Sequence, residues 1–207
     1  MDESIFAKLE SAGFGKVEID DRAREIKPVN GKYVCRLLDA GNKSGLSEKT
    51  GNEYDFWFIK AVITKDVSGD KGVNRRAERI ISFKDSEWSS AKESLGKYIG
   101  WLQAIVCRDA ELTSRLEAIA ITTFEMAEAG ADFVDIIIAI RAKLDELSKD
   151  AVGTLFLAKV SPQKDKDGNV KMDGDFPKQN VLPMKEFKEK GQVVDVKLEN
   201  DDEEVMF

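Results

Sequence analysis

The chain has 207 residues, of which 42% are hydrophobic, so it is long enough for one large domain with a sizeable core. It contains no histidine, which excludes the Ser-His-Asp and Cys-His catalytic arrangements and removes the most common metal ligand. The formal net charge is −7, but residues 191–207 hold six acids and one base, so the acidity belongs mostly to the end of the chain and does not argue against an anionic ligand.

The cysteines and the lack of targeting features predict a cytoplasmic protein. Cys35 and Cys107 are flanked by apolar residues and are typical of small buried hydrophobes in a reducing compartment. Residues 1–4 are acidic and do not resemble the start of a secretory signal. No apolar run reaches the ~18 residues of a membrane span.

The first part of the chain is predicted to contain an arm, a strand and a loop. Residues 1–30 show little periodicity and form the predicted N-terminal arm. Residues 32–40 are rich in residues that suit a pleated sheet, which predicts the first strand. Residues 41–51 contain three glycines among small polar residues and predict a mobile loop.

The second predicted strand, residues 53–64, contains the densest aromatic cluster of the chain. Alternation places Tyr54, Phe56 and Phe58 on one face and the intervening apolar residues on the other. Because both faces are apolar, the strand is either buried on both sides or covered on one side by something other than protein. Rings followed by Lys60 on one face are typical of a surface on which bases stack. A core strand under a helix is the alternative.

A basic segment follows the aromatic strand. Residues 60–84 hold seven bases and three acids. Glycines at 69 and 72 predict a hairpin that leads into a third strand over residues 76–84. Such a segment either follows a phosphate backbone or is simply a solvated hairpin.

From residue 85 the hydrophobic period becomes helical. Asp85 or Ser86 is a candidate N-cap, and Gly130 is expected to end the second helix. Helices are predicted over residues 88–105, 112–129 and 133–149. Their apolar positions predict core packing rather than a cofactor site.

Strands return after the helices. Residues 153–160 predict a strand, residues 165–169 predict an Asp-Gly hairpin turn, and residues 170–184 predict its partner. Pro177 and Pro183 are expected to confine that partner to a sheet edge. The turn resembles the opening of a calcium loop but lacks the later ligands, so no metal or other cofactor is expected.

Residues 191–207 form a predicted disordered acidic tail with an apolar tip. Closely spaced carboxylates repel one another and stay solvated, whereas exposed apolar side chains at the tip favour a partner over mere solubilisation. The predicted partner-binding residues are Asp201, Asp202, Glu203, Glu204, Val205, Met206 and Phe207.

The order of elements predicts a mostly β, α+β domain over residues 31–190. Three hairpin-linked strands, a helix and two further strands are the order of the five-stranded oligonucleotide-binding (OB) barrel. Here the segment between strands three and four, residues 85–150, is much longer than one helix and predicts an enlarged helical insertion. A different α+β sheet stays open as the alternative.

The chain resembles the single-stranded DNA-binding proteins of bacteriophage replication modules, including the T7-type proteins. The resemblance rests on the acidic tail ending at Phe207, on the aromatic strand around Phe56 and on the strand order. It implies an OB fold, a phage-encoded protein acting in the bacterial cytoplasm, and coating of single-stranded DNA during replication or recombination. It also implies that the tail recruits replication or recombination proteins.

The mechanism expected from these features needs no catalysis. Rings would stack on bases while cations follow the sugar-phosphate backbone, without sequence preference. The predicted DNA-binding residues are Tyr54, Phe56, Trp57, Phe58, Lys60, Lys65, Arg75, Arg76 and Arg79. A homodimer is an open alternative.

Two other functions compete with DNA coating. The first is a protein-interaction module, such as a recombination mediator or a DNA-mimicking inhibitor, that does not bind DNA directly. The second is a metal-dependent nuclease using Asp132 and Asp135, which fall on one helical face, but no further acid has a spacing that completes such a site. We therefore do not expect an enzyme.

Overall fold

The computed structural model describes residues 28–67, 74–82, 88–174, 176–189 and 192–194, together with Val196 and Leu198. Outside the described residues lie the tail from residue 199 onward, the predicted hairpin turn at residues 69–72, residues 83–84 of the third predicted strand, the candidate N-cap at Asp85 or Ser86, and the predicted arm except for residues 28–30.

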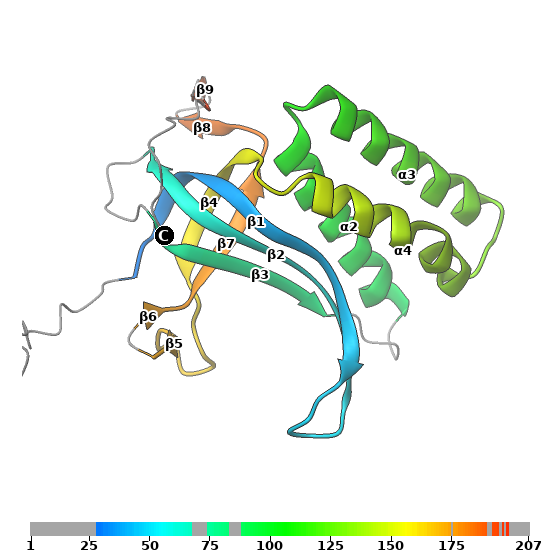
Figure 1. Ribbon diagram of the computed structural model, residues 1–207, viewed down its shortest axis with the longest axis horizontal. Helices are drawn as coiled ribbons and strands as arrows, with labels where there is room; N and C mark the ends of the chain where they lie inside the picture. The colour runs from blue at the N-terminus through cyan, green and yellow to red at the C-terminus, as the bar shows by residue number, and fades with distance from the viewer. Residues whose placement is uncertain are drawn as a thin grey trace, which may run out of the picture.

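The fold is mixed α and β, and five of the described strands pair in a closed ring (Figure 1). The order around the ring is β1-β2-β3-β7-β4, with β4 pairing back to β1. Neighbours pair antiparallel except β3 and β7, which meet in parallel through the pair Glu78 and Asn180. These strands are β1 (Gly31–Leu46), β2 (Glu53–Asp66), β3 (Arg76–Ser82), β4 (Leu155–Pro162) and β7 (Gln179–Met184).

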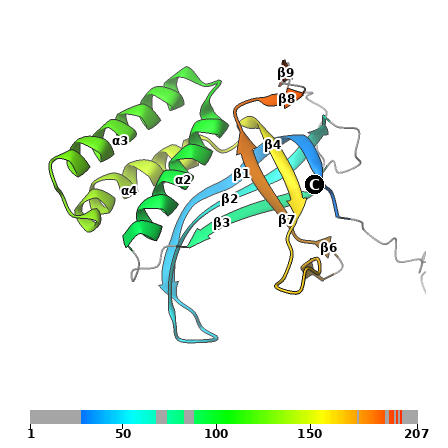
Figure 2. The ribbon, with the colours of Figure 1, turned by 180° about the vertical axis from the view of Figure 1, so that it is seen from behind.

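Between β3 and β4 the described chain forms three helices, α2 (Trp88–Val106), α3 (Ala110–Glu128) and α4 (Phe133–Asp150). They gather on one side of the ring (Figure 2). α2 packs on β3, β4 and β7, α4 packs on β1, and α3 packs on the other two helices. The predicted helix end at Gly130 is confirmed, since this residue follows α3 with a φ of 77° that favours glycine.

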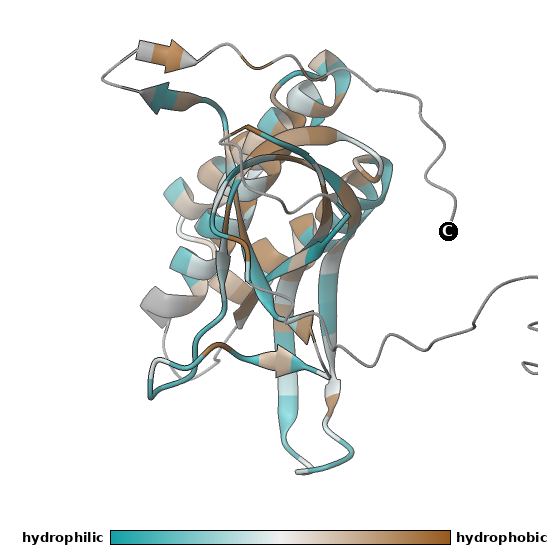
Figure 3. Ribbon diagram, turned by 90° about the vertical axis from the view of Figure 1, so that its left-hand side faces the viewer, coloured by the Kyte–Doolittle hydropathy of each residue, from teal (hydrophilic) through white to brown (hydrophobic). Residues whose placement is uncertain are grey.

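The ring and the helices share one hydrophobic core. Figure 3 looks through the ring and shows hydrophobic residues on its strands and on the helices behind it. Trp57 of β2 is fully buried, and its ring centroid lies 4.4 Å from that of Tyr98 on α2. The Tyr98 hydroxyl shares a 2.8 Å hydrogen bond with Ser148 on α4. Of the two cysteines expected to be buried, Cys35 lies in this core, whereas Cys107 is exposed after the end of α2. Burial raises the pKa of the Cys35 thiol to about 12, because the charged thiolate loses its hydration.

The predicted loop over residues 41–51 is wrong for its first half. β1 continues to Leu46 and pairs with β2 as far as Glu53, so the two strands form a long hairpin that extends beyond the ring (Figure 1). Backbone pairing along β2 compensates for the low strand propensity of the glycines here. The remaining predicted strands and helices are present, with ends shifted by a few residues.

The edge position predicted for residues 170–184 is also wrong. This part of the chain forms two short strands, β5 (Met172–Asp173) and β6 (Phe176–Pro177), and then β7, which lies between β4 and β3 in the ring. Pro183 is tolerated because, within the described strands, β7 meets β3 only at Asn180, so few ladder hydrogen bonds are needed on that side. The turn predicted at residues 165–169 is confirmed, with the Asp165 carboxylate accepting hydrogen bonds from the backbone N–H groups of residues 167 and 169.

A second hairpin, β8 (Phe187–Glu189) and β9 (Gln192–Val194), follows the ring and was not predicted. β9 and the buried Val196 belong to the start of residues 191–207, which were predicted to be a disordered tail. Phe187 and Val196 pack against Val34 of β1 and Leu157 of β4 in a separate hydrophobic cluster. The guanidinium of Arg108 donates a 3.2 Å hydrogen bond to the carbonyl of Val196. These contacts fix the chain at the point from which the acidic tail continues.

Candidate nucleic-acid interface

Three rings and a lysine form a row on the outer face of β2, because strand alternation turns every second side chain away from the core. The ring centroids of Tyr54 and Phe56 lie 5.6 Å apart, and those of Phe56 and Phe58 lie 6.2 Å apart. Lys60 is the next residue in the row and is exposed. The structure therefore brings these predicted site residues together on one surface, which we call the aromatic row.

The rings of the aromatic row differ in exposure. Tyr54 is 40% exposed and Phe56 is half-buried, whereas Phe58 is only 5% exposed. Gly45 of β1 is the cross-strand partner of Tyr54, and a Cβ at this glycine would lie 3.0 Å from the Tyr54 Oη. The missing side chain thus leaves the space that the tyrosine ring occupies.

Two ammonium groups lie over the ring of Phe58. The Nζ of Lys43 is 5.2 Å from the ring centroid and that of Lys60 is 5.3 Å away, within the range of cation–π attraction. Lys60 also pairs with Asp39, at 3.6 Å between Nζ and Oδ2. Lys43 has no carboxylate within 4.0 Å among the described residues. Among the described residues, the cationic end of the row therefore contains one lysine with a carboxylate partner, Lys60, and one without, Lys43.

A groove of about 950 Å³ runs beside Lys60, between β3 and the connection from β4 to β7. Its walls contain four bases and three acids, so the lining is mixed with a small positive excess. Phe176, which is 62% exposed, adds a ring on the far wall. The charged lining residues are Lys60, Arg75, Arg76, Lys178, Asp39, Glu78 and Asp173.

Three predicted DNA-binding residues lie away from this surface. Trp57 is fully buried against Tyr98, so it cannot stack on a base in this structure. The guanidinium of Arg79 lies 5.6 Å from the ring of Trp101 on α2, on the side of the sheet that faces the helices. Lys65 is exposed on β2 but does not line the groove. The predicted tail residues lie outside the described part of the chain.

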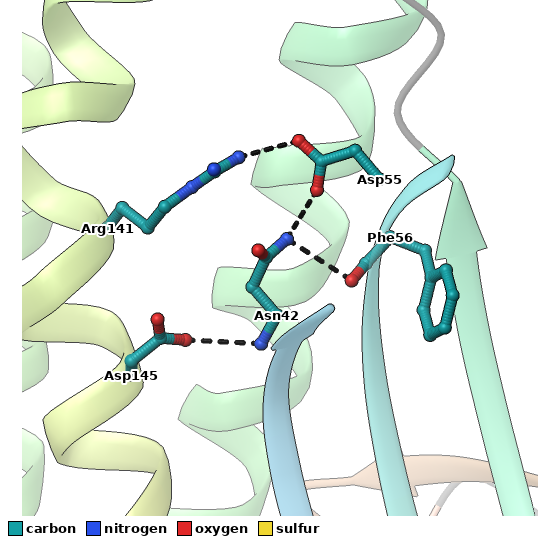
Figure 4. Close-up of polar contacts among 5 residues, drawn as sticks. All are labelled: Asn42, Asp55, Phe56, Arg141 and Asp145. Atoms are coloured by element: carbon teal, nitrogen blue, oxygen red, sulfur yellow. Dashed lines mark hydrogen bonds and ion pairs between the residues drawn. The ribbon is translucent and has the colours of Figure 1, made fainter. Parts of the chain in front are cut away.

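A polar network on the opposite face of the hairpin ties it to α4 (Figure 4). Arg141 donates to Asp55 at 2.7 Å, and Asp55 also accepts a 2.6 Å hydrogen bond from the Asn42 side chain. The Asn42 backbone N–H donates to Asp145 at 3.1 Å. Burial raises the pKa of Asp145 above its usual value, while the Asn42 N–H and Arg141 act in the opposite direction. Since Asp55 lies between Tyr54 and Phe56, the network positions the strand that holds both rings.

Sequence reasoning missed Lys43, Phe176, Lys178 and the α4 network. Lys43 lies in a glycine-containing stretch that predicted a loop, although a strand continuing in register with β2 would have placed it opposite Phe56. Arg141 lies 86 positions from Asp55, and nothing local in the sequence indicates that contact.

The acids proposed for a nuclease site do not form a metal cluster. Asp132 and Asp135 are exposed at the start of α4, and no group of three or more His, Cys, Asp or Glu residues in the described ranges is placed to hold a metal ion. In the same part of the chain, no helix combines the length and apolar character needed to cross a membrane.

Comparison with known proteins finds no family model and no curated relative that matches this chain.

Proposed function

We propose that this chain is a single-stranded DNA-binding protein with an OB fold that coats DNA without sequence preference. A five-stranded closed sheet with its helical segment inserted between the third and fourth ring strands supports the fold assignment. In that fold the face of strands two and three, together with the loops that join strands one to two and four to five, binds oligonucleotides. The aromatic row and the groove occupy this position.

The observation on which the proposal rests is the accessible pair Tyr54 and Phe56 beside a cationic surface. Bases have a π-face whatever their identity, so each exposed ring contributes ~1 to 3 kcal/mol of stacking that does not depend on sequence. Lys60, Arg76 and Lys178 border the groove and attract the phosphate backbone, with an affinity that falls as salt rises.

The acidic tail adds recruitment to DNA coating in this proposal. Its carboxylates and apolar tip are suited to a basic, partly apolar site on a replication or recombination protein. Because the tail presents closely spaced negative charge, it also competes with DNA for the cations of the groove at low salt.

The experiment that tests this function is fluorescence anisotropy of a labelled oligothymidine and of a labelled duplex, each titrated with the full chain across a salt series. We expect tight binding of the single strand, weaker binding of the duplex and a linear decrease of log affinity with log salt. Absence of oligothymidine binding at the lowest salt, or equal affinity for the duplex, would contradict the proposal.

A protein-interaction module is the second candidate, and the helices support it. Ile121 and Phe124 on α3, and Val134 and Ile138 on α4, are between 57% and 71% exposed. Large apolar side chains exposed on helices are common at docking surfaces. Light scattering of the wild type and of Phe124→Asp would detect self-association through α3. A monomer in both cases argues against a homodimer on this helix.

A further inference from the structure

We propose that Lys43, Phe58 and Lys60 form a phosphate-binding position at the end of the aromatic row, and that Phe58 positions the two ammonium groups instead of stacking on a base. This inference rests on the proposed function and assigns the ligand of one part of that site, a phosphodiester of the single strand. The sequence did not predict a role for Lys43 or the position of two ammonium groups at the ring of Phe58.

The burial of Phe58 separates its role from that of the other rings. A base that stacks needs an open aromatic face, and Phe58 is only 5% exposed whereas Tyr54 is 40% exposed. Its ring instead has two ammonium groups at 5.2 and 5.3 Å from the centroid. The negative π-face attracts each of them, so the ring restricts two long, otherwise flexible side chains that come from neighbouring strands.

The two ammonium groups reach the ring of Phe58 from neighbouring strands, since Lys43 lies opposite Phe56 on β1 and Lys60 follows Phe58 by two residues on β2. A phosphodiester beside the ring gains a charge-assisted hydrogen bond from the ammonium group that it reaches. A phosphodiester is the anion available wherever a base stacks on the adjacent Phe56. The cation pair and the stacking rings thus fit successive parts of the same strand.

The two lysines are not equivalent. Lys60 already has Asp39 at 3.6 Å and faces Glu78 across the β2–β3 pairing, so a phosphate must compete with carboxylates for it. Lys43 has no such competitor among the described residues. The Lys60–Asp39 pair is about half exposed on both sides and so contributes little to folding stability. Removing the Asp39 charge should therefore release Lys60 for the ligand without unfolding the protein.

The test measures the salt dependence of oligothymidine affinity for full-length Lys43→Ala, Lys60→Ala, Phe58→Leu and Asp39→Asn. Lys143→Ala is the matched control, because Lys143 is an exposed lysine on α4. Log affinity falls as log salt rises, and we expect Lys43→Ala to make this slope shallower by ~0.7, the value for one lost phosphate contact on a single strand. Lys60→Ala should make the slope shallower by a smaller amount, and the control variant should keep the wild-type slope.

Two variants distinguish positioning by the ring from simple loss of charge. Phe58→Leu removes no charge, yet it should make the slope shallower, because the two ammonium groups lose the aromatic ring that positions them. Asp39→Asn should tighten binding and steepen the slope. A variant that merely damages the fold does not tighten binding, so Asp39→Asn keeps the test valid even where Phe58→Leu fails to fold.

The source of the anion is tested with two further probes. An oligothymidine with a neutral methylphosphonate backbone should bind wild type and Lys43→Ala with equal affinity, and inorganic phosphate should compete only weakly. Strong competition by inorganic phosphate would assign the position to the free ion and overturn the phosphodiester assignment.

Failure of this inference and failure of the proposed function give different results. If wild type binds oligothymidine but Lys43→Ala and Asp39→Asn behave like Lys143→Ala, the phosphate position is wrong and DNA binding stands. If folded Phe58→Leu keeps the wild-type slope, the positioning role is wrong. If wild type binds no oligothymidine at any salt, both are wrong.

Discussion

At the scale of single residues, strand alternation determines the candidate site. The sequence predicted that Tyr54, Phe56 and Phe58 share one face of β2 and that Trp57 lies on the other, and the structure agrees. It could not predict which face is outward, because both faces are apolar and hydropathy alone does not distinguish them. The packing of Trp57 on Tyr98, a residue of a distant helix, turns the other face towards solvent.

The rings of Tyr54 and Phe56 should account for most of the sequence-independent affinity. We expect Tyr54→Ala and Phe56→Ala each to weaken oligothymidine binding by ~1 to 3 kcal/mol, or about 5- to 150-fold. Phe124→Ala, which truncates a 65% exposed ring on α3, is the matched control and should bind like wild type. Anisotropy titrations measure all three. Unchanged affinity in both strand variants would remove the aromatic row from the interface.

Asp145 should make stability depend on pH. Its folded-state pKa is raised, mainly by burial, so the unfolded chain releases this proton first as pH rises. Stability from this group is therefore greatest in acid and is lost as pH rises through the raised pKa. Asp145→Asn avoids the charge and its amide oxygen can still accept from the Asn42 N–H.

We expect Asp145→Asn to be more stable than wild type at pH 7 by about 1 kcal/mol or less, given its partial exposure, and equal to wild type in acid. Urea unfolding at both pH values measures the difference. A destabilised Asp145→Asn at neutral pH would show that the carboxylate charge helps the fold.

At the scale of elements, the long β1–β2 hairpin is the main departure from what the sequence predicted. Local propensity predicts a loop where Gly41 and Gly45 occur, whereas pairing with β2 and the side chain of Asn42 maintain a strand there. The partners of this network on α4 are distant in sequence, so no local pattern shows them. The helices, whose apolar period is long and regular, were predictable within a few residues.

Removing the contact between α4 and the β1–β2 hairpin should increase local opening of the hairpin and have a smaller effect on global stability. Arg141→Ala removes the 2.7 Å contact with Asp55, whose side chain is about one quarter exposed, and we expect a cost of about 1 kcal/mol. Hydrogen exchange of the backbone amides between residues 42 and 56 should become faster, because local opening no longer breaks this contact. DNA affinity should fall with it, since Tyr54 and Phe56 flank Asp55.

Arg115→Ala is the control for this prediction. It removes a comparable 2.8 Å pair with Asp150, which joins α3 to α4 and does not involve the hairpin. Exchange between residues 42 and 56 should remain as in wild type. Equal acceleration in both variants would mean that the helices as a whole, and not the Asp55 contact, restrain the hairpin.

At the scale of the whole molecule, the ring and its helices share one core, and Phe187 and Val196 pack on the ring. The β8–β9 hairpin was not predicted because its charged residues hide the apolar signal. The packing of Phe187 against β1 and β4 depends on strands far earlier in the chain. The start of the predicted tail, as far as Val196, is thus part of the fold. The predicted function of the tail belongs to residues 199–207.

Two truncations should separate these roles. Ending the chain after Leu198 should leave the melting temperature unchanged and should tighten oligothymidine binding at low salt, because the competing carboxylates are gone. Ending it after Met184 also removes Phe187, which is 1% exposed, and Val196, and should cost at least ~3 kcal/mol. Thermal and urea unfolding measure both. A lower melting temperature for the variant that ends after Leu198 would show that residues 199–207 contribute to folding stability.

The closure of the ring between β3 and β7 has a consequence for ligand binding. Within the described strands these two meet through one residue pair, Glu78 and Asn180, so this joint has little backbone hydrogen bonding to resist separation. Glu78 and Gln179 also line the groove. A polymer lying across both walls would hold the joint shut. Ligand binding and separation of β3 from β7 would then be coupled. The ligand-free protein would open first between these two strands, and a bound ligand would stabilise the same contact.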